Sequence, residues 1–263
     1  MRPDMSVTID ALTEADTAGT TAPPTGPRRF RVFRYKRGDE RPHYETFEVP
    51  VGHRTTVFEA LRWIQVHRDR TLALRHSCLH ASCGTCGVRV NGKEALACVT
   101  MVHDVGREIT VEPIANVPVL TDLVVDMREV FERFPDDHPI VRGSEFLDDA
   151  DTPDGIASYE RYEDCIECGL CVSACPVVVT AERYVGPAAL AWGERVLEEP
   201  RGAEVANLLS WANAPDGVWR CHAIFECTAA CPSGVNPAAR IMSLRGTLLG
   251  RRLRKQPRGS DPT

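Results

Sequence analysis

Cysteine is the residue type with the clearest chemical potential in this chain. The sequence of 263 residues contains eleven cysteines, gathered at 78–98, 165–175 and 221–231. An odd number cannot pair completely into intramolecular disulfides. The acidic N-terminus also lacks the basic and apolar regions of a secretory signal. We therefore expect a compartment that keeps thiols reduced, and metal ligation is the first hypothesis for these side chains.

The first cysteine set has the spacing C-x4-C-x2-C-x11-C, which is typical of plant-type [2Fe-2S] ferredoxins. It consists of Cys78, Cys83, Cys86 and Cys98. Small residues in the loop, among them Gly84 and Gly87, would let backbone N–H groups approach the bridging sulfides of a cluster. A structural zinc site with four thiolates is the alternative, although zinc sites are dominated by short-spaced pairs.

The remaining cysteines follow the C-x2-C-x2-C-x3-C-P spacing of bacterial ferredoxins, in which the fourth cysteine of each run binds the other cluster. In the second run, at 221–231, Ile224 stands where the middle ligand is expected. Exchange of the fourth cysteines gives a complete set for [4Fe-4S]: Cys165, Cys168, Cys171 and Cys231. The three thiolates that remain suit [3Fe-4S], a cube that lacks one iron: Cys175, Cys221 and Cys227.

The strands that must position the first cysteine set are indicated by alternation of apolar and polar residues. This alternation occurs at 30–35 and 45–49, and the segment 108–114 is a further strand candidate. Asn91 and Gly92 predict a type I′ turn, because both residue types accept the positive φ angles that this turn needs. Two hairpins and a closing strand are therefore expected.

A helix is expected between the two hairpins. Thr56 and Glu59 have the spacing of a capping box, and Val57, Leu61 and Ile64 would share one helical face. The first part of the chain is therefore predicted to be a small mixed sheet curled over one helix, ending near residue 114.

Helical periodicity dominates the chain after Pro118. Apolar residues recur at intervals of three and four over 121–134, which predicts an amphipathic helix there. Further helices are predicted at 187–198, 203–211 and 237–249, the last with Asn236 as its N-cap and Gly250 as its stop. The acidic segment 135–155 is expected to be an extended surface connection, and no solenoid repeat is present.

These patterns predict an α+β protein with two domains and two terminal tails. The expected parts are a flexible N-terminal tail at 1–27, a [2Fe-2S] domain at 28–117, a helical domain at 118–250 and a basic C-terminal tail at 251–263.

A formal charge of −6 and a pI near 5.8 argue against a general nucleic-acid binder. Seven basic side chains between 240 and 258 are expected to face anionic lipid or an anchor subunit, with a solvated tail as the alternative.

From about Arg28 to Arg245 the sequence resembles the iron–sulfur subunit of succinate dehydrogenase and fumarate reductase, the complex II family. The resemblance rests on SCLHASCGTCGVRVNGKEALAC, DLVVDM, CIECGLCVSACP, YVGPAAL, GVWRC and CPSGVNPAA. It implies an N-terminal β-grasp plant-type [2Fe-2S] ferredoxin domain, followed by an all-helical bacterial-type two-cluster ferredoxin domain.

The resemblance also implies a function in electron transfer, with no substrate chemistry in this chain. Electrons would pass between the FAD of a flavoprotein subunit and a quinone at a membrane anchor subunit, in either direction. The chain would be a peripheral subunit on the cytoplasmic face of the cell membrane. The alternatives are the iron–sulfur subunit of another flavin-linked dehydrogenase, such as a soluble thiol-linked fumarate reductase, and a zinc-stabilised interaction module.

Quinone contacts are implied beside the [3Fe-4S] site, at Pro176, His222, Ile224 and Arg245. Structural roles stand beside these functional ones: Pro176 as a helix stop, His222 as a surface residue and Arg245 as a solvated helical arginine. Thr180 stands where many succinate dehydrogenases carry a quinone-contacting tryptophan. This departure leans toward the fumarate reductase type.

Overall fold

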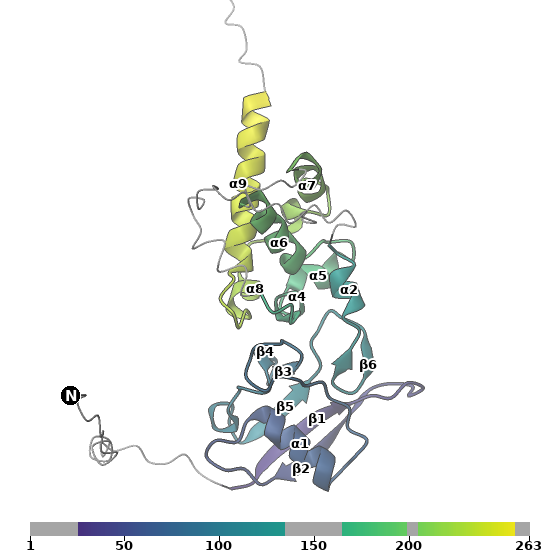
Figure 1. The fold of residues 1–263 in the computed structure, drawn as a ribbon. Coiled ribbons are helices and arrows are strands. Elements are labelled where there is room, and N and C mark those ends of the chain that lie inside the picture. Colours follow the sequence, from purple (N-terminus) through teal and green to yellow (C-terminus); the bar gives the residue numbers. More distant parts are fainter. Residues whose placement is uncertain (1–25, 135–164, 199–204, 256–263) are drawn as a thin grey trace, which may run out of the picture.

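A five-stranded sheet is followed by a group of helices in the computed structural model, which describes residues 26–134, 165–198 and 205–255 (Figure 1). The strands are β1 (Arg28–Arg34), β2 (His43–Val49), β3 (Gly87–Val90), β4 (Lys93–Leu96) and β5 (Glu108–Glu112). Their order is β2-β1-β5-β3-β4, with β1 and β5 parallel and the other neighbours antiparallel. Asn91 and Gly92 have φ angles of 51° and 79° in the turn between β3 and β4. The predicted hairpins and closing strand are confirmed.

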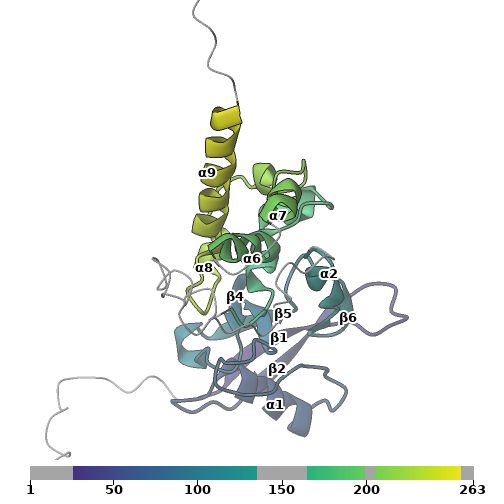
Figure 2. The same cartoon turned by 45° about the horizontal axis from the view of Figure 1, so that its top comes forward.

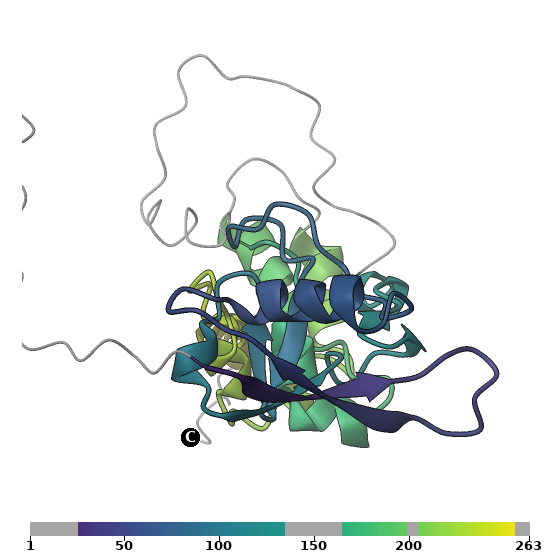
Figure 3. The ribbon, with the colours of Figure 1, turned by 90° about the horizontal axis from the view of Figure 1, so that it is seen from below.

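Helix α1 (Val57–His67) lies across one face of this sheet (Figure 3). Its inward residues, including Val57, Leu61 and Ile64, are almost completely buried in the core. The Thr56 hydroxyl accepts a hydrogen bond from the Glu59 N–H at 3.1 Å, and the Glu59 carboxylate accepts one from the Thr56 N–H at 2.8 Å. The predicted capping box therefore begins the helix.

The predicted helix over 121–134 is wrong for most of its length. The structure has a two-stranded hairpin of β6 (Val119–Thr121) and β7 (Val124–Val125), then one helical turn, α2 (Arg128–Phe131). The part of the chain after residue 118 is therefore not all-helical. Apolar residues at intervals of three and four were insufficient evidence for a helix here. The segment also contains Val124 and Val125, which are β-branched and form strand β7.

Asp122 gives the physical reason for this hairpin. It is completely buried and has a left-handed backbone with φ of 44°. Its carboxylate accepts hydrogen bonds from Arg34 Nε at 3.1 Å, Lys36 Nζ at 2.5 Å, and the N–H groups of Tyr35 and Ala73 at 3.0 and 2.8 Å. These tertiary bonds outweigh the local helical pattern, since a buried carboxylate needs its partners.

The second half of the chain consists of helices around the remaining cysteines. They are α4 (Leu170–Ser173), α5 (Pro176–Thr180), α6 (Pro187–Glu198), α7 (Val205–Ala212), the 3₁₀ helix η3 (Val218–Arg220), α8 (Glu226–Ala229) and α9 (Pro237–Lys255). Helices α6 and α9 pack together and share a buried ion pair of 3.0 Å between Glu194 and Arg240. In Figures 1 and 2, the end of α9 extends away from the sheet.

The predicted helix at 187–198 is confirmed at both ends, and α7 confirms the described part of the helix at 203–211. The Asn236 side chain accepts a hydrogen bond from the Ala239 N–H at 3.3 Å, as an N-cap does. Gly250 is not the stop, because α9 continues to Lys255. The arginine, leucine and lysine residues that follow Gly250 favour helix and outweigh one glycine.

Several predicted segments lie wholly or partly outside the described residues. These are most of the N-terminal tail, the connection at 135–155 and the end of the basic tail. Within the part of the chain that the structure describes, no helix has the length and apolar character needed to cross a bilayer.

Candidate metal centres

The first cysteine loop, between α1 and β3, directs backbone N–H groups at one sulfur. Cys78 Sγ accepts hydrogen bonds from the N–H groups of Ser82 and Cys83 at 3.3 Å and of His80 at 3.5 Å. The Cys78 N–H in turn points to Cys83 Sγ at 3.5 Å. Converging N–H donors stabilise negative charge, so the loop suits a thiolate or a cluster anion.

Left-handed backbone at residues other than glycine recurs in all the cysteine loops. Leu79 and Ala81 have φ angles of 64° and 63° in the first loop, Glu167 has 52° in the second, and Ala223 and Phe225 have 53° and 69° in the third. Such conformations are costly and concentrate at functional sites. Ala81 adopts one of these left-handed conformations, which a glycine at the same position would adopt without strain.

The sulfurs of the first set are close enough to perturb one another. A hydrogen bond from the Thr85 side chain is the main cause that lowers the pKa of Cys83 to about 6. Burial raises the pKa of Cys86 to about 12, and the hydrogen-bonded Cys98 sulfur adds to this rise. Gathered thiolates repel each other unless cations compensate their charge, so this donor set fits bound iron.

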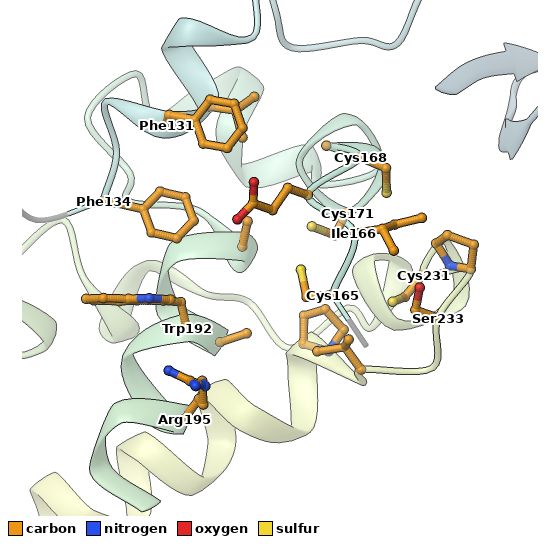
Figure 4. Close-up of a pocket in the computed structure, with 18 residues that line it drawn as sticks. Phe131, Phe134, Cys165, Ile166, Cys168, Cys171, Trp192, Arg195, Cys231 and Ser233 are labelled. Atoms are coloured by element: carbon orange, nitrogen blue, oxygen red, sulfur yellow. The ribbon is translucent and has the colours of Figure 1, made fainter. Parts of the chain in front are cut away.

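The second set lies along one side of a cavity of about 270 Å³. Cys165, Cys168, Cys171 and Cys231 line it, and Figure 4 shows their side chains on this side, with Phe134 and Trp192 on another. Burial raises the pKa of Cys168 to about 11 and that of Cys171 well above its usual range. Cys231, distant in sequence, therefore lies with the first three cysteines of the earlier run.

The third set lines a smaller cavity beside α5 and α8. Its cysteines are Cys175, Cys221 and Cys227, and Tyr184 lines the same cavity. Cys221 Sγ accepts a hydrogen bond from the Ala223 N–H at 3.4 Å. Burial raises the pKa of Cys227 to about 11, and the sulfurs of Cys175 and Cys221 add to this rise. The structure thus groups the cysteines as the exchanged assignment requires.

Three of the residues expected near quinone line this third cavity. Pro176, His222 and Ile224 all border it and are exposed, Ile224 to 50%. Pro176 is the first residue of α5 and lies two residues beyond Ala174, the C-cap of α4, so it begins one helix just after the preceding one has ended. Proline is compatible with this position because an N–H in the first helical turn has no intrahelical acceptor, so the missing N–H of proline costs no hydrogen bond. Thr180, the last residue of α5, is also exposed.

Arg245, in α9, contacts the chain that leads into Cys221. It is not among the residues that line the third cavity. Its guanidinium donates to the Val218 carbonyl, with Nε at 2.9 Å, and to the Cys221 carbonyl. It is partly buried beside the Trp219 ring. The solvated-arginine alternative is therefore wrong, and Arg245 holds the turn that presents Cys221.

The three cysteine sets adjoin one another in order. Gly84 of the first loop packs against Cys168 of the second set, where a Cβ on Gly84 would lie 2.8 Å from the Cys168 Cβ. Cys171 of the second set lies in α4 and Cys227 of the third lies in α8, and these two helices pack together. The second set therefore lies between the other two.

A multi-atom group suits these sites better than a single ion. Four cysteines line a cavity of about 270 Å³, which is larger than a single metal ion would fill. Iron–sulfur clusters have this size and take cysteine ligands.

Two supporting residues were not singled out from the sequence. Tyr184 is 1% exposed, and its phenol lies beside the sulfurs of Cys221 and Cys175. Asn116 Nδ2 donates to the carbonyls of Val172, Ser173 and Cys175, at 2.9, 2.9 and 3.1 Å. Tyr184 belongs to the YVGPAAL motif, which was its signal, whereas Asn116 had no local signal because its partners are more than 50 residues away.

Comparisons with known proteins agree with these sites. The family model of a 2Fe-2S iron-sulfur cluster binding domain matches residues 29–132, and that of a 4Fe-4S dicluster domain matches residues 161–235. A solved chain in the Mycobacterium smegmatis Sdh1 complex in the apo form has the same fold, with a TM-score of 0.77 and 22% identity. The match covers 89% of this chain and 100% of that one.

Sequence relatives include the fumarate reductase iron-sulfur subunit of Mycobacterium tuberculosis, which is 36% identical over 86% of this chain and 94% of the relative. The succinate dehydrogenase iron-sulfur subunit of Coxiella burnetii is 30% identical over 84% of this chain and 96% of the relative. With two iron–sulfur domain models matched and relatives that cover most of its length, the chain belongs to the family of succinate dehydrogenase and fumarate reductase iron–sulfur subunits.

Proposed function

We propose that this chain relays electrons through three iron–sulfur clusters between a flavoprotein subunit and membrane quinone. The observation that carries the proposal is the succession of adjoining cysteine sets, from the contact of Gly84 with Cys168 to the packing of α4 on α8. Electron tunnelling is fast only over short distances, so adjoining sites suit a relay. The clusters supply one-electron redox chemistry, and the protein supplies their position and electrostatic surroundings.

Each cluster has its own set of cysteines in this proposal. The [2Fe-2S] cluster takes Cys78, Cys83, Cys86 and Cys98; [4Fe-4S] takes Cys165, Cys168, Cys171 and Cys231; and [3Fe-4S] takes Cys175, Cys221 and Cys227. The N–H groups that point at Cys78 and Cys221 stabilise added negative charge and so raise the reduction potentials. Residues 28–117 would form the plant-type ferredoxin domain, and residues from 118 the two-cluster domain.

The partners in this proposal are an FAD-containing flavoprotein at the [2Fe-2S] end and a membrane anchor at the [3Fe-4S] end. Pro176, His222 and Ile224 are exposed around the third cavity and are the candidates for quinone contact. Arg245 acts on them indirectly, through the carbonyls at 218 and 221. The chain would lie peripherally on the cytoplasmic face of the membrane.

Activity of the complex purified anaerobically with its native partners tests this function. We expect succinate-dependent quinone reduction, quinol-dependent fumarate reduction, or both. Fumarate reduction driven by thiols, without quinone-linked activity in either direction, would instead identify the soluble thiol-linked enzyme. Pro176→Ala and His222→Ala are expected to raise the KM for quinone while electron transfer to a soluble dye that accepts electrons from the flavoprotein is unchanged.

A further inference from the structure

Gly84 of the first cysteine loop packs directly against the backbone of the second cysteine loop. A Cβ on this residue would lie 2.6 Å from the Ile166 carbonyl oxygen, 2.8 Å from the Cys168 Cβ and 3.0 Å from the Cys168 Cα. Separations below about 3 Å are incompatible with carbon–carbon contact. The atoms in the way belong to backbone and to a ligand Cβ, so they cannot turn aside as the end of a flexible side chain can.

The α4 segment that follows the second loop is hydrogen-bonded to the first half of the chain, which limits how far this loop can move if a Cβ is added to Gly84. Ser173 Oγ, in the same α4 segment, donates to Glu94 of the sheet at 2.9 Å and accepts from the Ala115 N–H at 2.8 Å. Asn116 holds three carbonyls at the end of α4. Because these bonds hold α4 in place, a Cβ on Gly84 can be accommodated only by a shift of the second loop away from the first at the point of contact.

We propose that Gly84 is a positioning residue that sets the separation between the first and second cluster sites. This inference rests on the proposed function. The step concerned moves one electron between a reduced and an oxidised neighbouring cluster; no bond forms or breaks and no proton moves. Because the tunnelling rate falls steeply with distance, a glycine that permits backbone contact keeps this step fast.

The chain offers a matched control for the backbone strain that alanine would add. Gly92, in the hairpin turn, has a φ of +79°, similar to the +67° of Gly84, but the nearest atom to its added Cβ is Arg89 Nη2 at 3.9 Å. Gly84→Ala and Gly92→Ala therefore share the left-handed penalty. They differ in the contact with the second loop.

Gly87 gives an intermediate case. Its φ is not left-handed, and an added Cβ would lie 3.3 Å from Leu170 Cδ2 and 3.4 Å from the Cys168 carbonyl oxygen. The Leu170 methyl group can give way by a few tenths of an ångström. Gly87→Ala is therefore expected to separate the loops less than Gly84→Ala does, and without backbone strain.

The experiment compares the three variants in the complex isolated anaerobically. Magnetic coupling between the reduced [2Fe-2S] and [4Fe-4S] clusters is measured by pulsed electron paramagnetic resonance, and the rate of electron arrival at the second cluster by freeze-quench. We expect Gly84→Ala to weaken the coupling and slow the transfer several-fold. Gly87→Ala should have a smaller effect of the same sign, and Gly92→Ala should match the wild type.

Unchanged coupling and rate in Gly84→Ala, at full cluster content, would overturn the inference. If Gly84→Ala does not assemble, Gly87→Ala decides: coupling weaker than in Gly92→Ala supports the role of the loop contact, and equal coupling refutes it. Failure of the proposed function is recognised separately, because the wild-type complex itself would then lack one of the two cluster signals.

Discussion

At the scale of single residues, the proposed assignment of [3Fe-4S] to the third cavity rests on Ile224. It stands where the C-x2-C-x2-C-x3-C run places a ligand, and it borders the cavity lined by Cys221 and Cys227. An apolar side chain cannot ligate iron, so a cube at this site has one corner without a protein ligand. Three thiolates then suit [3Fe-4S].

Ile224→Cys is predicted to convert the third cluster to [4Fe-4S], because it supplies the missing thiolate. Electron paramagnetic resonance of the oxidised, anaerobically prepared protein should lose the [3Fe-4S] signal, and the iron content should rise by about one atom per chain. Ile224→Val, which keeps the corner apolar, should retain the signal. If the introduced cysteine is unmodified and the [3Fe-4S] signal still persists in Ile224→Cys, the assignment of position 224 to the missing ligand is contradicted.

Tyr184 gives a second prediction at this scale. Burial, together with the neighbouring sulfurs of Cys221 and Cys175, raises the pKa of its phenol, so the hydroxyl stays protonated and can donate to Cys221. Hydrogen bonds to cluster sulfurs favour the reduced state. Tyr184→Phe should therefore lower the reduction potential of the third cluster by roughly tens of millivolts, since 59 mV corresponds to a tenfold change for one electron.

A redox titration followed by electron paramagnetic resonance measures this shift. The potentials of the first two clusters serve as internal references and should stay unchanged. A third-cluster potential equal to that of the wild type would show that the hydroxyl has no influence on the cluster.

The grouping of the cysteines could be anticipated from the sequence, because cluster motifs encode ligand exchange in their spacing. The roles of Tyr184 and Arg245 could not. Each acts on a residue more than 20 positions away, on the Cys221 sulfur and the Val218 carbonyl respectively. Only the folded chain brings these groups together.

At the scale of elements, the sequence correctly predicted features whose signal lies entirely in neighbouring residues. The capping box at Thr56 and the turn at Asn91 each need only neighbouring residues, and both are present. The hairpin of β6 and β7 was missed because its stability comes from outside the segment. There Asp122 joins β1 and the chain after α1 to the hairpin.

Asp122→Asn is predicted to destabilise the folded protein by roughly 3 kcal/mol, the cost of breaking a buried ion pair. Burial alone would raise the pKa of Asp122, but hydrogen bonds from Lys36, Ala73, Tyr35 and Arg34 outweigh it and lower the pKa below the usual 3.8. The stabilisation by the carboxylate is therefore complete above pH 3.8 and is lost only as the pH falls through the lowered value.

The penalty of Asp122→Asn should consequently be constant between about pH 6 and pH 8, which thermal unfolding of the cluster-loaded protein can measure. Asp126→Asn is the control, because its partner Arg128 is largely exposed, and little change is expected. A penalty that varies strongly within this pH range would assign the effect to another group.

At the scale of the whole molecule, the two halves meet through their cysteine loops. Gly84 and Gly87 of the first half lie against Cys168 and Leu170 of the second, and the Asn116 side chain caps the end of α4. The first two cysteine sets thus meet at the junction of the two halves, and the relay proposed here depends on this junction. Its geometry could not be predicted from spacing, which relates ligands within a motif but not one domain to another.

Iron and acid-labile sulfide in the full chain, produced and purified without oxygen, test the central claim most directly. Clusters of the three proposed types give about nine iron atoms per chain, with two-, four- and three-iron contributions, and negligible zinc. An iron content of about four or less after anaerobic isolation, or zinc in place of iron, would contradict the three-cluster relay.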